Sequence, residues 1–171
     1  TYMQMLGALS DWLKKAQLQM GMSEAESLLS ARLAPDMFPL STQIRFACVQ
    51  AQEAVFRLQG EAFPSSLGEL VDEGRNAGEH PGSIAEAQNR ISETIAMLAA
   101  VAPAALDEDP KKNIEHALPN GMIFDLTAEQ YARDWTLPQY AILRGEKVEL
   151  GKADYIPHLL PYLRAETVPT V

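Results

Sequence analysis

Side chains that could bind a metal ion or act as a nucleophile are few and widely spaced in this sequence. The three histidines are His80, His116 and His158, and no H-x-x-x-H or E-x-x-H pair places two ligands on one helix face. The single cysteine, Cys48, lies in the apolar stretch IRFACVQAQEAV, where a buried and unreactive thiol is the ordinary interpretation. We therefore predict no metal site and no cofactor.

Other catalytic patterns are equally sparse. The sequence contains no G-x-S-x-G turn and no glycine-rich loop that would hold a phosphate. The carboxylates of Glu53, Asp125 and Asp134 could serve as acids or bases, but a solvated surface role is the simpler interpretation for each. These residues do not decide whether the protein is an enzyme.

The stretch ARLAPDMFPL, residues 31–40, holds the most distinctive polar residues. Asp36 directly precedes an apolar periodic segment, so we expect its carboxylate to cap a helix that begins at Met37. Pro39 then falls in the first helical turn, where a missing N–H group costs nothing. Arg32 lies four residues before Asp36, close enough for an ion pair. This structural interpretation competes with a catalytic or ligand-binding loop.

The elements that must position these residues are mainly helices. Apolar residues recur at steps of three and four over 2–20, over 37–58, and from Ser83 to the residue before Pro103, which predicts three long amphipathic helices. Ser23 with Glu26 and Ser83 with Glu86 have the spacing of capping boxes. A short helix to about residue 30 and another near 66–74 complete this part of the chain, and Gly21 and Gly60 mark helix ends.

A β-hairpin is expected at about residues 113–126. In NIEHALPNGMIFDL, apolar residues alternate with polar ones on both sides of Asn120-Gly121, the pair favoured in tight hairpin turns. Thr127 with Gln130 then predicts the capped start of a fourth helix that runs into Pro138. Because only QYAILRG follows before Gly145, this helix is short beside the other three.

Composition excludes several classes of partner. The chain has 171 residues, a formal net charge of -9 and a pI near 4.8, which argues against nucleic-acid binding and against docking on anionic membranes. No apolar run approaches the ~20 residues of a membrane span. We expect a single domain in the cytoplasm. The sequence begins at Thr1 without a methionine, so we also expect that residues precede it.

Three motifs resemble those of a known family. LLSARLAPDMFPLSTQ, RDWTLPQ and YAILRGEKVELGKADYIPHLLPYLR are similar to an uncharacterised bacterial family of unknown function, related to the DinB/YfiT-like four-helix-bundle proteins, a superfamily of proposed metalloenzymes. The resemblance spans nearly the whole chain. It implies a mostly all-α fold over residues 1–171, an up-down-down-up four-helix bundle with the hairpin before the last bundle helix. It also implies a homodimer.

The sequence departs from that pattern in two places. Metal-binding members of the superfamily use a histidine on the second long helix and a histidine pair on the fourth, whereas STQIRFACVQAQEAVFRLQG contains no histidine. The three-histidine site therefore cannot form. The family also continues after LPQ with a histidine-containing aromatic segment, whereas here Gln139 is followed directly by Tyr140. We hypothesise that about eight residues, two helical turns, are omitted at this point.

These observations support a protein of unknown function on a DinB-like scaffold that lacks the three-histidine metal site and binds a small molecule. The binding residues expected at the mouth of the bundle are Arg32, Asp36, Gln43 and Asp134. The alternative is a metal- and thiol-dependent transferase or isomerase of the superfamily, and only that alternative requires a divalent metal. A third interpretation is a stress-related interaction module without pocket chemistry.

Overall fold

The computed structural model describes residues 2–106, 109–118, 121–136, 162 and 164. The chain divides into two compact units: unit 1 comprises Thr1–Val55 and Ala62–Ala102, and unit 2 comprises Phe56–Glu61 and Pro103–Val171. The described part is mostly helical with one small antiparallel hairpin, so the predicted fold class is confirmed. The expected break between Gln139 and Tyr140 and the histidine at 158 lie outside the described residues.

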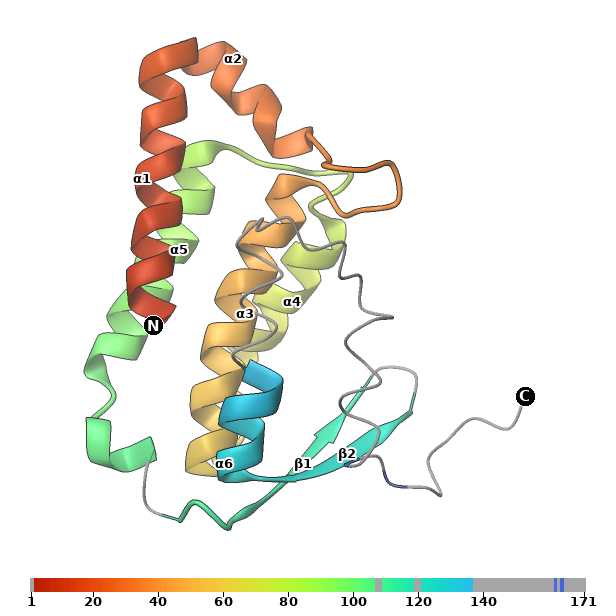
Figure 1. The fold of residues 1–171 in the computed structure, drawn as a ribbon. Coiled ribbons are helices and arrows are strands. Elements are labelled where there is room, and N and C mark those ends of the chain that lie inside the picture. Colours follow the sequence, from red (N-terminus) through yellow and green to blue (C-terminus); the bar gives the residue numbers. More distant parts are fainter. Residues whose placement is uncertain (1, 107–108, 119–120, 137–161, 163, 165–171) are drawn as a thin grey trace. The chain divides into compact units, whose positions relative to one another are not determined.

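Unit 1 is built from helices (Figure 1), and its long helices bury apolar side chains in a common core. The three long helices predicted by periodicity are present, and α1 packs along α5. Between α3 and α5 in the sequence, α4 is a regular helix that continues past Gly74 to Asn76, where a loop was expected. The helical elements are α1 (Tyr2–Met20), α2 (Met22–Ser27), the 3-10 turn η1 (Leu28–Ser30), α3 (Leu40–Gln59, which enters unit 2 after Val55), α4 (Ser65–Asn76) and α5 (Ile84–Ala100).

The core of unit 1 is aliphatic with a few buried polar groups. Cys48 on α3 is fully buried, and Thr94 on α5 is buried with it and donates its hydroxyl to the Arg90 carbonyl. The Ser41 hydroxyl donates to the Ala77 carbonyl at 2.8 Å, which ties α3 to the end of α4. The apolar side chains of this core include Leu6, Leu13, Ala25, Leu29, Ile44, Val49, Leu67, Leu70, Ile84, Ala87 and Ile91.

Of the capping boxes expected in unit 1, one forms and one does not. The Ser83 hydroxyl accepts from the Glu86 N–H at 3.2 Å, and the Ser83 N–H donates to the Glu86 carboxylate at 2.7 Å, so this box is confirmed. The box expected at Ser23 is wrong, because α2 already begins at Met22 with Gly21 at its N-cap and no side-chain cap bond.

The helix start expected at Asp36 is also wrong. Residues 35–37 form a turn and bend, and α3 begins at Leu40. Pro39 explains the shift, because a proline ring disfavours helical geometry for the residue before it and so keeps Phe38 out of the helix. Asp36 is exposed in the turn and caps nothing.

Unit 2 contains the predicted hairpin. β1 (Asn113–Ala117) pairs antiparallel with β2 (Ile123–Thr127), with His116 opposite Phe124. Gly121 has φ 86°, the left-handed conformation that a hairpin turn requires and that glycine adopts readily. Alternate residues are buried, so Ile114 and His116 share one face. The helical turn η2 (Pro103–Leu106) precedes the hairpin.

The segment after the hairpin starts as predicted but changes its geometry. Thr127 and Gln130 form a complete capping box at the start of α6 (Ala128–Gln130). A π-helix, η3 (Tyr131–Thr136), follows in place of the regular α-helix that was expected. Asp134 and Trp135 both lie within this π-helix. Within the described ranges, no helix combines the length and apolarity needed to cross a membrane.

Candidate functional site

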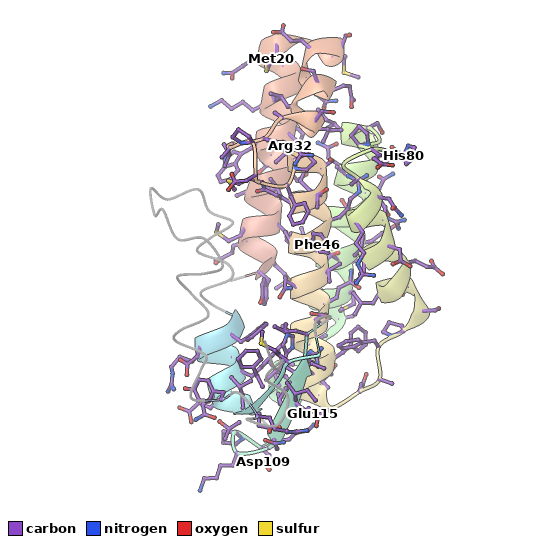
Figure 2. All side chains as sticks on the ribbon, turned by 90° about the vertical axis from the view of Figure 1, so that its right-hand side faces the viewer. Met20, Arg32, Phe46, His80, Asp109 and Glu115 are labelled. Carbon is purple, nitrogen blue, oxygen red and sulfur yellow. The ribbon has the colours of Figure 1, made fainter. Side chains whose placement is uncertain are left out.

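The predicted binding residues of unit 1 gather around the segment between η1 and α3. Arg32, labelled in Figure 2, donates a guanidinium hydrogen bond to the Met37 carbonyl rather than pairing with Asp36 as expected. Gln43 on α3 donates its amide to the Phe38 carbonyl at 2.7 Å. Both side chains therefore donate to backbone carbonyls of the loop before α3, and these hydrogen bonds explain why polar residues occupy the two positions.

Asp134, the fourth predicted residue, belongs to unit 2. Its carboxylate accepts from Arg133 Nε at 2.7 Å and Nη2 at 2.9 Å, and from the Tyr162 hydroxyl at 2.7 Å. These donors lower the pKa of Asp134, Arg133 most strongly. The structure therefore brings Arg32, Asp36 and Gln43 to one loop, and it gives Asp134 to a different unit as an ionised and well-partnered acceptor.

The most unusual polar group in unit 2 is His116. Only 4% of its surface is exposed, because the alternation of β1 places it on the buried face. Its ring centroid lies 3.9 Å from that of Trp135 and 5.8 Å from that of Tyr131. Phe124 extends this aromatic cluster, 5.6 Å from Trp135. We call His116, Phe124, Tyr131 and Trp135 the His116 cluster.

The hydrogen bonding of His116 is incomplete. Its Nδ1 atom is buried, and no described residue lies within hydrogen-bond distance of it. A buried polar atom without a partner costs roughly 1–3 kcal/mol, so native proteins contain few of them. Within the described part of unit 2, the imidazole therefore offers a donor or an acceptor that its own fold does not use.

The electrostatic environment keeps His116 neutral. Burial, and secondarily the positive charge of Arg57, lower its pKa to about 3 from the ordinary value of 6.5. Arg57 comes from the last turns of α3 and donates from Nη1 to the Glu115 carbonyl at 3.0 Å. At neutral pH one ring nitrogen of His116 carries a proton and the other is an acceptor.

Charged side chains fix the hairpin that carries His116. The Arg164 N–H donates to the Ile123 carbonyl at 2.8 Å, at the edge of β2. Its guanidinium donates to both carboxylate oxygens of Asp125, at 2.8 and 2.6 Å, and to Glu115, which Figure 2 labels on the hairpin, at 2.8 Å. These contacts position β1 and β2 firmly, and the pKa of Asp125 is lowered chiefly by Arg164.

Cys48 in unit 1 lies in surroundings that disfavour its thiolate. Burial raises the pKa of its thiol to about 11, and a side-chain hydrogen bond with Thr94 offsets this only in part. The reactive form of cysteine is the thiolate, which is scarce at neutral pH when the pKa is this high. The buried thiol expected from the sequence is confirmed.

The residues that the structure describes do not supply the three-histidine metal centre that the family resemblance implies. α3 contains no histidine, and over the described ranges no three His, Cys, Asp or Glu side chains are grouped so that they could hold one ion. His80 is exposed in unit 1, and His116 is buried among aromatic rings in unit 2.

The sequence pattern contained one usable sign of the His116 cluster. The alternation around Asn120-Gly121 placed His116 on the same face as Ile114, which is the buried face. The contribution of Trp135 had no comparable sign, because a regular helix was expected where the π-turn occurs.

Comparison with known proteins agrees with the fold. Residues 1–156 match the model of a family described as "Domain of unknown function (DUF1993)". No functionally curated protein matches the chain. The crystal structure of a DinB family member protein from Shewanella denitrificans, at 1.83 Å resolution, is similar with a TM-score of 0.56 and 25% sequence identity, over 91% of this chain and 86% of that one. The resemblance inferred from the motifs is confirmed.

Proposed function

The chain belongs to the DUF1993 family of unknown function and has a DinB-like fold, and from this premise we propose that it binds a small organic molecule at the His116 cluster of unit 2. The observation that carries the proposal is the buried Nδ1 atom of His116, which has no hydrogen-bond partner among the described residues. Aromatic rings combined with a few polar atoms are a common composition for small-molecule sites.

A second feature supports the same location. Trp135 and Tyr131, two members of the cluster, lie in the π-helix η3. A π-turn is rarer than a regular α-helical turn and is frequently found at functional sites. The unusual backbone and the unusual histidine therefore coincide in one small region of unit 2.

The chemistry of the cluster limits the ligand. The Nδ1 atom of the neutral imidazole can form one hydrogen bond with a hydroxyl or amide group of a ligand. The aromatic rings of Trp135 and Tyr131 favour a flat apolar body in the same ligand. The proposed ligand is therefore a small, flat molecule with one hydroxyl or amide group. The homodimeric state and the cytoplasmic location expected from the sequence are part of this proposal, and a metal is not.

Titration of the histidine side chains with simple probes tests the proposal. Phenol, benzamide and indole are added to protein labelled with ¹⁵N, and the imidazole nitrogens are observed by NMR. We expect at least one probe to shift the Nδ1 resonance of His116 and to leave that of exposed His80 in place.

A pair of variants separates binding from general effects. His116→Phe keeps the aromatic volume and removes the hydrogen bond, so we expect at least tenfold weaker binding of the active probe. His80→Phe makes the same change at an exposed site of unit 1 and should bind the probe like the wild type. If all three probes leave the His116 resonances unmoved, the proposed function is wrong.

A further inference from the structure

Two residues of unit 2 that follow η3 in the sequence connect the elements that form the His116 cluster. The Tyr162 hydroxyl donates to the Asp134 carboxylate of η3 at 2.7 Å. The Arg164 guanidinium donates to Asp125 on β2 at 2.8 and 2.6 Å, and to Glu115 on β1 at 2.8 Å. We call Tyr162 and Arg164 the clasp, because together they bond to η3 and to both strands of the hairpin.

Each acceptor of the clasp is the sequence neighbour of a residue in the His116 cluster. The three neighbouring pairs are Asp134 with Trp135, Asp125 with Phe124, and Glu115 with His116. Successive side chains of a strand lie on opposite faces, so Arg164 binds the outer face of the hairpin and the cluster occupies its buried face. A shift of any acceptor therefore moves the backbone directly beside a ring of the cluster.

The charges of the hairpin depend on the clasp. Glu115 and Asp125 lie directly opposite each other across β1 and β2, and like charges in this position destabilise a sheet. Arg164 adds one positive charge that both carboxylates share, and its contact with Asp125 is bidentate. Bidentate pairs between arginine and a carboxylate are among the stronger ion pairs in proteins. The register that places His116 opposite Phe124 is therefore stabilised by Arg164.

We propose that Tyr162 and Arg164 are positioning residues for the His116 cluster, and that the docked clasp holds the hairpin and η3 in the arrangement that binds the ligand. The part of this inference that concerns ligand affinity rests on the proposed function. The part that concerns the packing of the cluster does not, so the two are tested separately.

Ionic strength distinguishes this role from direct contact with the ligand. The proposed ligand is uncharged and His116 is neutral, so their hydrogen bond has little dependence on salt. The ion pairs of the clasp are accessible to salt, because the side chains of Arg164, Asp125 and Glu115 are 30%, 35% and 54% exposed. Dissolved ions screen such pairs. We therefore expect salt to weaken the binding of a neutral ligand through the clasp.

Fluorescence of Trp135 tests the packing of the cluster without any ligand. The chain has two tryptophans, so Trp12→Phe leaves Trp135, which is 4% exposed, as the single reporter. In this background we expect Arg164→Gln to raise the acrylamide quenching constant at least about threefold. The matched control is Arg75→Gln, which removes an exposed arginine that pairs with Asp72 on α4 of unit 1, and it should leave quenching unchanged.

Two further variants separate the clasp from a general loss of stability. Ser83→Ala removes the cap of α5 in unit 1 and should leave the quenching of Trp135 unchanged. Asp125→Asn removes the bidentate partner of Arg164, so its effect on quenching should not add to that of Arg164→Gln in the double variant. Quenching in Arg164→Gln that equals the wild-type value, or that Ser83→Ala reproduces, would overturn the positioning role.

Titrations with phenol, benzamide and indole then test the effect on affinity. Between about 0.01 M and about 0.5 M NaCl, we expect the dissociation constant of the active probe to rise at least about threefold in the wild type. In Arg164→Gln it should be high at both concentrations. A probe that binds equally at both salt concentrations and in both proteins would overturn the control of affinity by the clasp. If no probe binds the wild type, the proposed function and the effect on affinity are wrong, while the quenching result still decides the positioning role.

Discussion

The Arg45 guanidinium and the Glu73 carboxylate form an ion pair inside unit 1, with Arg45 Nε 2.8 Å from Glu73 Oε1. Arg45 is 2% exposed and also donates to the Ser41 carbonyl. The second oxygen of Glu73 accepts from Arg90 Nε at 2.8 Å. One carboxylate on α4 therefore links an arginine of α3 to an arginine of α5, and three helices depend on it.

Loss of the Glu73 charge should destabilise the fold strongly. Glu73→Gln leaves the buried Arg45 charge uncompensated, and we expect the free energy of unfolding to fall by about 3 kcal/mol in urea titrations. Glu69→Gln on the same helix is exposed and should change it by less than about 0.5 kcal/mol. Equal stability of the two variants would mean that the network contributes little.

The two capping boxes expected in unit 1 provide a matched pair of mutations. Ser83→Ala removes the hydroxyl that accepts from the Glu86 N–H, so we expect a loss of about 1 kcal/mol in the free energy of unfolding. Ser23→Ala changes a residue of α2 whose side chain caps nothing, and should be close to neutral. Thermal melts of both variants check this, and a cost for Ser23→Ala equal to that of Ser83→Ala would contradict it.

Two glycines should respond to alanine in opposite directions. Gly82 has φ 69°, and an added Cβ would lie 2.6 Å from Glu86 Oε2 and 3.0 Å from Arg45 Nη2, so Gly82→Ala should lower the melting temperature. Gly68 lies within α4 with nothing near its Cβ position, and Gly68→Ala should raise stability by about 0.5–1 kcal/mol because alanine is the better helix former. Differential scanning calorimetry distinguishes the two outcomes.

His116 predicts a specific loss of stability in acid. The folded state holds its pKa near 3, below the ordinary 6.5, so the unfolded chain binds a proton more readily and stability falls as the pH drops from about 6.5 toward 3. The expected slope from this group is about 1.4 kcal/mol per pH unit. Urea titrations at pH 7, 6 and 5 should show it in the wild type.

The variant His116→Phe isolates this contribution. It has no titrating group at position 116, so it should not share the loss of stability that His116 causes in the wild type. The free energy of unfolding of the variant minus that of the wild type should therefore increase as the pH falls from 7 to 5. Carboxylates that titrate at lower pH are common to both proteins and cancel in the difference. A constant difference across this range would show that the pKa of His116 is not depressed.

Cys48 should react only when the protein unfolds. Its side chain is fully buried and burial raises its pKa to about 11, so a disulfide reagent at pH 8 should label less than a tenth of the native protein while the fold persists. The chain has no other cysteine, so labelling in urea reports unfolding directly. Rapid labelling of the native protein would place the thiol at the surface.

The sequence alone determined the element types and most of their ends. Apolar steps of three and four residues specify an amphipathic helix, and strict alternation around a turn pair specifies a hairpin, because each period places one face against the core. The caps at Ser83 and Thr127 are local hydrogen bonds between near neighbours, so short-range spacing was sufficient to predict them. Where two local signals competed, as at Asp36 and Pro39, the restraint from proline decided the helix start.

Only the tertiary structure decided which polar residues are unusual. Arg45 and Glu73 are 28 residues apart and meet because α3 and α4 pack together, and nothing near either residue in sequence indicates the other. Trp135 reaches His116 through a π-turn, which no short pattern predicted. The burial of a charge or of a ring nitrogen depends on distant segments, whereas periodicity depends on neighbours. For this reason the helices could be predicted from the sequence, and the His116 cluster required the fold.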